Sequence, residues 1–225
     1  MGRDIVLDTP GGAIGAWRAD PMGAPRGGLV VVQEIFGVNP HVREVADRYA
    51  AEGYVALAPA FFDGVAGQAH GIELDGTPEG TTRGRALVDA LGLEAAVAIV
   101  QAAARQLQGE GLKVGVVGFC WGGTVALLAN TRLGLPASSY YGARNVPFLG
   151  EPLRAPMQFH FGEEDPTIPP DAVEAHRLRQ PGAETFSYPG AGHAFNRDSD
   201  SAHYRADAAH AAHARTMVLF AGALS

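Results

Sequence analysis

The chain has 225 residues, of which 47% are hydrophobic and 18% are charged, so it can bury a sizeable core as one domain over 1–225. A formal net charge of −7 argues against a nucleic-acid partner and against binding to an anionic membrane. The N-terminus lacks the apolar core of a signal peptide, and no apolar run approaches the roughly 18 residues that span a bilayer. A single cysteine forms no internal disulfide. We therefore expect a cytoplasmic protein.

Short apolar segments alternate with helix-like segments along the chain. Two early segments, 5–7 and 14–18, flank Pro10-Gly11-Gly12, which predicts an antiparallel hairpin at one edge. Further strands are predicted at 28–34, 54–58, 113–119, 157–161 and 185–188, and helices at about 41–52, 93–108, 121–133, 170–179 and 201–219. This alternation predicts an α/β fold with a mostly parallel sheet and helices on both faces. The Gly-rich region 63–84 is predicted to be irregular.

The only cysteine lies in Gly118-Phe-Cys120-Trp-Gly122-Gly123, between a predicted strand and a predicted helix. This is the pattern of a nucleophile elbow, with sulfur in place of the serine hydroxyl. Small flanking residues permit a strained backbone at the nucleophile and a close approach of strand and helix. The dipole of the helix that follows favours a thiolate and later an oxyanion. The alternative is a small buried apolar residue in a tight turn.

Downstream segments supply an acid and a histidine in the order that such an elbow requires. Asp165 follows the predicted strand 157–161, and His193 lies in a Gly-rich loop after the predicted strand 185–188. Loops at the carboxyl ends of parallel strands share one edge of the sheet, so both side chains are expected near Cys120. For Asp165 the alternative is a helix cap before Pro166 and Pro170.

With these motifs the chain resembles the dienelactone hydrolases, or carboxymethylenebutenolidases, which have the α/β-hydrolase fold. The resemblance runs nearly end to end and rests on the segments 33–39, 118–123, 140–142, 162–165 and 190–195. It implies a single α/β-hydrolase domain with no large lid. It also implies that Cys120 is the nucleophile, that His193 is the general base and acid, and that Asp165 orients the histidine.

Glu34 has an implied role of its own. In the family, the matching glutamate hydrogen-bonds the resting thiol and takes up its proton once substrate arrives. A free thiol has a pKa of about 8.5, so thiolate is scarce at neutral pH without such help. The alternative is an exposed carboxylate at a strand end. The implied oxyanion donors are the backbone N–H groups of Ile35 and Trp121.

The resemblance also suggests residues that bind the substrate. Dienelactone hydrolases hold the substrate carboxylate with arginines, and Arg197, four residues after His193, matches one such position. The second position falls in 81–85, where this chain is shorter than well-known members, and we favour Arg85 over Arg83. Tyr141 is a further substrate-binding candidate. Each arginine has the alternative of a solvated surface residue.

The expected function is the opening of a lactone or ester, most of all a dienelactone of aromatic-compound degradation, through a cysteinyl thioester. Two alternatives stay open: a general carboxylesterase of the same family, and a non-catalytic protein that senses thiols or binds a small molecule. We expect no cofactor and no metal, because His203, His210 and His213, which could share a face of the last helix, lack a nearby carboxylate or cysteine motif. The expected partner is a small substrate, with no nucleic acid and no membrane, and the expected state is a monomer or small homo-oligomer.

Overall fold

The computed structural model describes residues 2–225, and its internal contacts divide the chain after Gly115 into two compact units. Each unit is described by itself. Both combine strands with helices, and most neighbouring strands run parallel. The predicted α/β class is therefore confirmed, whereas the prediction of one domain over 1–225 stays a prediction.

The first unit contains a four-stranded arrangement in the order β1-β2-β4-β3. Its elements are β1 Arg3–Thr9, β2 Gly12–Ala19, β3 Gly28–Val32, α1 Pro40–Ala51, β4 Val55–Pro59, the 3₁₀ helix η1 Phe61–Gly64, α2 Pro78–Leu91 and α3 Leu93–Gly109. Strands β1 and β2 form the predicted antiparallel hairpin, β2 pairs antiparallel with β4, and β4 pairs parallel with β3.

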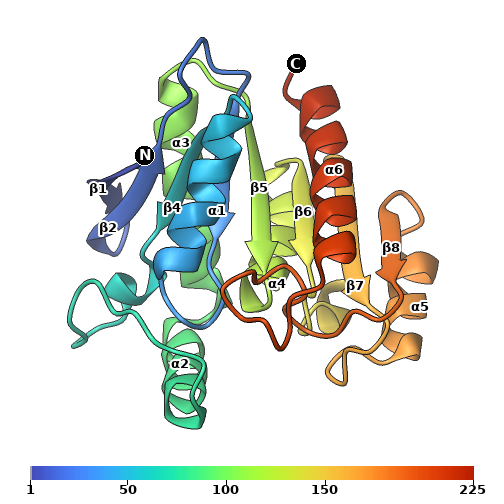
Figure 1. Cartoon of the computed structure of the whole chain (residues 1–225). Coiled ribbons are helices and arrows are strands. Elements are labelled where there is room, and N and C mark those ends of the chain that lie inside the picture. Colours follow the sequence, from blue (N-terminus) through green and yellow to red (C-terminus); the bar gives the residue numbers. More distant parts are fainter. Residues whose placement is uncertain (1) are drawn as a thin grey trace. The chain divides into compact units, whose positions relative to one another are not determined.

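Helices α1 and α3 cover opposite faces of β3 and β4 (Figure 1). Every residue of these two strands is buried, as expected for apolar runs that do not alternate with polar residues. Helix α3 packs closely on β3 because Gly28 has no side chain: a Cβ atom there would lie 3.0 Å from Cδ1 of Leu107.

The second unit contains parallel strands in the order β5-β6-β7-β8. Its elements are β5 Val114–Phe119, which begins just before the division, α4 Trp121–Leu128, the π-helical turn η2 Ala129–Leu133, β6 Ala137–Tyr140, the 3₁₀ helix η3 Val146–Phe148, β7 Met157–Gly162, α5 Pro170–Arg179, β8 Glu184–Tyr188 and α6 Ala206–Ala223. Helices α4 and α6 lie on opposite faces of these strands (Figure 1). All four strands end at the edge where the loops to α4, α5 and α6 begin.

The prediction of an irregular region over 63–84 is confirmed for 65–77, which contain no helix or strand, and is wrong from Pro78 on, where α2 begins. Thr77 caps this helix: its Oγ1 accepts a hydrogen bond from the Gly80 N–H at 3.1 Å, and proline occupies the first helical position. Within residues 2–225 no single helix is long and apolar enough to cross a membrane. Helices α2 and α3 meet that test only as a pair, and they are bent by 80°.

Two further elements differ from the prediction. Strand β6 was not predicted, because its sequence Ala-Ser-Ser-Tyr carries two serines in four residues, although all four are buried. The last helix begins at Ala206 and not at 201. His203 lies before this helix, and its Nδ1 is 2.8 Å from Oδ2 of Asp200. The expectation that His203 could share a helix face with His210 and His213 is therefore wrong.

Candidate active site

Cys120 forms the turn between β5 and α4, with φ 55° and ψ −118°. Its N–H donates to the carbonyl of Tyr140 at 3.0 Å, which fixes this strained backbone against β6. The flanking glycines are needed for steric reasons. A Cβ atom on Gly118 would lie 1.9 Å from the Gly122 oxygen, and one on Gly123 would lie 2.8 Å from the Tyr140 oxygen. The elbow predicted from the sequence is therefore present.

The turn after β7 and the loop after β8 are hydrogen-bonded to each other. The N–H of Glu163 donates to the Tyr188 carbonyl at 3.1 Å, and the N–H of Glu164 donates to the Ala191 carbonyl at 2.8 Å. This approach depends on Gly162, since a Cβ atom there would lie 2.4 Å from the Ala191 oxygen. The turn that carries the acid and the loop that carries the histidine thus form one packed unit.

The thiol, imidazole and carboxylate predicted from the sequence are joined by two successive contacts. Nε2 of His193 is 3.1 Å from Sγ of Cys120, and Nδ1 of His193 is 2.6 Å from Oδ2 of Asp165. Asp165 is buried, whereas Cys120 is partly exposed and can meet a ligand. In such an arrangement the imidazole can take the proton of the nucleophile while the carboxylate fixes the tautomer of the ring.

Thr167 also belongs to this site, although the sequence analysis did not select it. Its N–H and its Oγ1 both donate to Oδ1 of Asp165, at 2.8 and 2.6 Å, and Oγ1 lies 3.2 Å from Nδ1 of His193. The helix-cap alternative for Asp165 is wrong, because the residue at the N-cap of α5 is Pro169. The spacing Asp-Pro-Thr is typical of an aspartate that bonds the backbone two residues on, a signal that could have found Thr167.

The electrostatics of this cluster favour a charged histidine. Burial alone lowers the pKa of His193, but its hydrogen bonds to Asp165 and Cys120 outweigh burial and raise that pKa to about 10. For Asp165, burial raises the pKa, but hydrogen bonds from His193 and Thr167 outweigh it and hold the pKa below its usual value. An imidazolium beside a sulfur atom stabilises the thiolate form of a cysteine.

Tyr141 packs against the histidine. The centroid of its ring lies 5.1 Å from that of His193 and 5.3 Å from that of Phe195, and its N–H donates to the carbonyl of His160 at 2.8 Å. Its side chain is fully buried, so it restricts the movement of the imidazole. Contact between Tyr141 and a substrate stays a prediction.

Arg197 lies in the same loop as His193 and is already engaged by an acidic side chain. Its Nη1 is 3.3 Å from Oδ2 of Asp200, and its side chain is only 15% exposed. Because Asp200 offsets part of the guanidinium charge, the attraction that Arg197 offers to a substrate anion is reduced. Its predicted role toward a carboxylate stays a prediction.

Trp121 is buried as the first residue of α4, and the remaining predicted residues belong to the first unit. Glu34 follows β3 and is 3% exposed, so the alternative of an exposed strand-end carboxylate is wrong. Ile35 is also buried, and its carbonyl lies so close to α2 that a Cβ atom on Gly84 would be 2.0 Å from it. Arg83 and Arg85 flank that glycine on α2, and both are exposed. The preference for Arg85 stays a prediction.

The 35–38 segment, which begins with Ile35, is held from two sides within the first unit. The N–H of Leu74 donates to the Phe36 carbonyl at 2.9 Å. Nη1 of Arg43 donates to the Val38 carbonyl at 2.6 Å, and the same guanidinium contacts both carboxylate oxygens of Glu73, at 2.6 and 3.1 Å. The backbone around Ile35 is therefore fixed by contacts from α1 and from the segment before α2.

Comparison with known proteins gives the family. A family model described as the dienelactone hydrolase family matches residues 14–224. The carboxymethylenebutenolidase of Pseudomonas putida is 32% identical over 219 residues, which are 91% of this chain and 89% of that protein. A Synechocystis protein assigned the same activity is 37% identical over 214 residues, which cover 85% of this chain and 84% of that protein.

The chain belongs to the dienelactone hydrolase family. A crystal structure of a Klebsiella pneumoniae protein assigned to dienelactone hydrolases matches with a TM-score of 0.83 and 28% identity, and the match covers 98% of each chain. The fold is thus the α/β-hydrolase fold, and the protein is a hydrolase of lactones or esters with a small-molecule substrate. Within residues 2–225, no group of three or more His, Cys, Asp or Glu side chains is arranged to hold a metal.

Proposed function

We propose that this dienelactone hydrolase opens its substrate by covalent catalysis at Cys120, through a thioester intermediate. The observation that carries the proposal is the line of contacts Sγ–Nε2 at 3.1 Å and Nδ1–Oδ2 at 2.6 Å. Two further features support it: the strained φ of 55° at Cys120 and its place at the N-terminus of α4. Both favour a nucleophile over an inert buried thiol.

The first half of the reaction forms the thioester. The Cys120 thiolate attacks the carbonyl carbon of the lactone or ester, and the carbonyl oxygen becomes an oxyanion. We assign the N–H groups of Ile35 and Trp121 to that oxyanion by resemblance to the family. The ring or ester C–O bond then breaks, and His193, which is protonated at neutral pH, gives its Nε2 proton to the departing oxygen.

The second half releases the acid. His193, now neutral, takes a proton from a water molecule, and the hydroxide that forms attacks the thioester carbonyl. The C–S bond breaks, the carboxylic acid leaves, and the thiolate is restored beside the imidazolium. Glu34, which took up the thiol proton when substrate arrived, then returns it to the thiolate and holds the resting thiol until the next turnover. This role is assigned by resemblance and supported by the burial of the carboxylate.

A dienelactone-type substrate, which carries a carboxylate, is the first candidate. Arg197 and Arg85 are assigned to that carboxylate, since a guanidinium matches it with two parallel hydrogen bonds. A neutral ester is the second candidate. It is favoured by the contact between Arg197 and Asp200 at 3.3 Å, because a nearby carboxylate weakens the attraction for an anion.

The deciding test is a comparison of Cys120→Ala with wild type on an acidic lactone and on a neutral chromogenic ester. Replacing the nucleophile should lower kcat/KM by several orders of magnitude on both substrates. The fold should survive, since the change removes one sulfur atom from a partly exposed side chain. Mass spectrometry should detect an acyl adduct on wild type and none on the variant. Near-normal turnover by a folded Cys120→Ala protein would refute the cysteine mechanism.

A further inference from the structure

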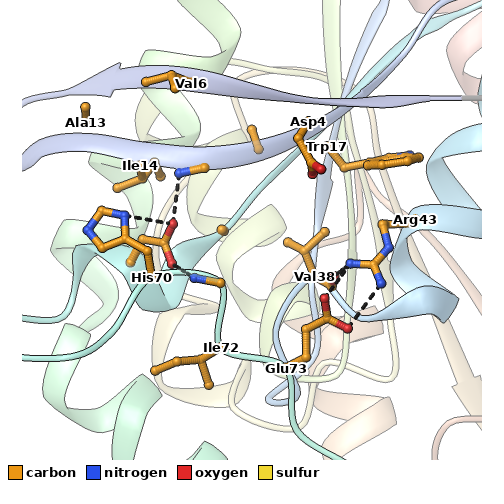
Figure 2. Close-up of a pocket in the computed structure, with 15 residues that line it drawn as sticks. Asp4, Val6, Ala13, Ile14, Trp17, Val38, Arg43, His70, Ile72 and Glu73 are labelled. Atoms are coloured by element: carbon orange, nitrogen blue, oxygen red, sulfur yellow. Dashed lines mark hydrogen bonds and ion pairs between the residues drawn. The ribbon is translucent and has the colours of Figure 1, made fainter.

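A cavity of about 510 Å³ lies in the first unit, between the β1–β2 hairpin and the 70–73 segment (Figure 2). Its volume is in the range of small-molecule sites, about 300–1,000 Å³. None of its lining residues is used by the proposed reaction. The proposed reaction therefore gives this cavity no function.

The hairpin forms one wall of the cavity. Cross-strand pairing sets Asp4 opposite Trp17 and Val6 opposite Gly15, so these four residues lie on one face. Because Gly15 has no side chain, the Asp63 carboxylate can approach the middle of this face: a Cβ atom on Gly15 would lie 3.1 Å from Oδ2 of Asp63. The larger apolar side chains around the space are Val6, Ile14, Val38 and Ile72.

Asp63 ties the opposite wall to the hairpin. Its carboxylate accepts hydrogen bonds from the N–H of Gly15 at 2.9 Å and from the N–H of Gly71 at 2.7 Å, and Nδ1 of His70 lies 3.4 Å away. The Asp63 side chain is only 2% exposed. A buried carboxylate that bridges both walls holds the cavity open in a defined shape.

The charges around the cavity are predominantly negative. Three carboxylates (Asp4, Asp63, Glu73) and one guanidinium (Arg43) line it, which leaves a formal charge of −2 when His70 is neutral. Glu73 neutralises Arg43 through two contacts, at 2.6 and 3.1 Å. Within the described chain the Asp4 carboxylate makes no hydrogen bond or close ion pair, although its charge helps to raise the pKa of Arg43. Figure 2 shows Asp4 beside the ring of Trp17, and the Arg43 guanidinium lies 5.8 Å from the centroid of that ring. Asp4 is thus the acidic group that is available to a ligand.

We propose that this cavity binds an organic ammonium ion with a small apolar or aromatic body. The ammonium group would pair with Asp4, beside the indole of Trp17, whose ring already attracts the Arg43 guanidinium at 5.8 Å. The apolar body would cover Val6 and Ile72. An anion of the same size is disfavoured by the formal charge of −2, so the cavity selects a charge opposite to that of the acidic lactone.

The test uses the chain's two tryptophans as reporters, one in the cavity and one beside the nucleophile. Benzylammonium is titrated into ¹⁵N-labelled protein while the indole N–H signals of Trp17 and Trp121 are followed, with the Trp121→Phe variant giving the assignment. Benzyl alcohol and benzoate are the neutral and anionic controls of similar size. Benzylammonium should shift the Trp17 signal saturably, and the two controls should shift it far less.

Three variants then test whether benzylammonium binding depends on this cavity or only on the net charge of the protein. Asp4→Asn should weaken benzylammonium binding by up to about fivefold, the range for an ion pair open to solvent. Asp8→Asn, in the same strand but outside the cavity, removes the same charge and should change little. Ala13→Phe should fill the space and abolish the shift while hydrolysis continues. The proposal is wrong if Trp17 does not respond, if benzyl alcohol binds equally well, if only Trp121 responds, or if the two aspartate variants behave alike.

Discussion

Backbone strain in this chain is concentrated around the candidate triad. Among the described residues, the non-glycine positions with positive φ are Cys120, Tyr141 and Ala194, at 55°, 40° and 61°. The first carries the thiol, the second packs on His193, and the third follows His193 directly. A non-glycine residue held at positive φ costs about 1–3 kcal/mol of folding free energy. Three such residues around the candidate triad indicate that the geometry of this site is maintained at the expense of stability.

Thr167 offers a test of positioning within the triad. Thr167→Val keeps the shape of the side chain and the backbone N–H but removes the hydroxyl that donates to Asp165 at 2.6 Å. A hydrogen bond to a charged group contributes about 1.5–3 kcal/mol, so kcat/KM should fall roughly ten- to a hundredfold. Because that bond helps to lower the pKa of Asp165, the acid limb of the pH profile should move to higher pH. Thr167→Ser should restore both properties; a Val variant with the wild-type profile would contradict the role.

Arg197 separates the two substrate candidates. Arg197→Ala should reduce kcat/KM for an acidic lactone about ten- to a hundredfold, as expected for the loss of a charged hydrogen bond. A neutral ester should lose little. Asp200→Asn is the matched variant, because it removes the carboxylate 3.3 Å from Nη1 and should improve the acidic substrate alone. Equal losses on both substrates, or none, would make Arg197 a structural residue and favour the neutral ester.

At the scale of elements, α2 owes its first turn to a side-chain cap. Thr77→Ala removes the acceptor for the Gly80 N–H and should lower the free energy of unfolding by about 1 kcal/mol. Thr82→Ala, in the same helix, is the control, because its hydroxyl bonds only back to the Pro78 carbonyl and its loss should be neutral or slightly stabilising. Urea unfolding of the three proteins gives the comparison. Equal stability of the Thr77 variant and wild type would show that packing alone defines α2.

The elements that could be predicted from the sequence are those whose own residues form a recognisable pattern. Strands β3 and β4 are apolar runs that end at turn residues, and the elbow has glycines on both sides of the cysteine. Strand β6 carries no such signal. Its Ser138 is acceptable in the interior because its hydroxyl pairs with that of Thr216 on α6 at 2.9 Å. A partner 78 residues away is not visible in the local pattern.

The candidate site shows the same limit. The order of Cys120, Asp165 and His193 could be predicted, since loops after parallel strands meet at one edge and the distances agree with that expectation. The contact between Arg197 and Asp200 could not, because arginine is exposed by default and only the loop's own fold brings the two together. Short motifs therefore predicted the groups that the structure brings together, whereas the contacts that modify the charge of Arg197 required the structure.

For the molecule as a whole, the triad makes stability depend on pH. The pKa of His193 rises from about 6.5 in the unfolded chain to about 10 in the folded chain. Between these values the folded chain holds a proton that the unfolded chain has released, so this group's contribution is complete below about pH 6.5 and is lost toward pH 10. The pKa of Asp165 is lowered, so its contribution is present above about pH 3.9 and is lost in acid.

This dependence can be measured by urea unfolding of wild type and His193→Gln at about pH 6 and about pH 9. The difference in unfolding free energy between the two proteins should be larger at the lower pH, where the imidazolium–carboxylate pair is fully formed. A His160→Gln variant should show the opposite sign: burial lowers the pKa of His160 to about 3, so at about pH 6 only the unfolded chain binds this proton, and wild type loses stability relative to that variant as pH falls. A difference that is the same at both pH values would rule out the raised pKa of His193.

The guanidinium of Arg43 touches both the Val38 carbonyl and Glu73, so one side chain joins a wall of the ammonium cavity to the 35–38 segment. A cation that draws Glu73 toward itself would loosen the support behind the Ile35 amide. If that amide serves the oxyanion, the amine would act as a noncompetitive inhibitor, lowering kcat and leaving KM unchanged. The hydrolase would then slow down in response to an amine that resembles neither its substrate nor its product.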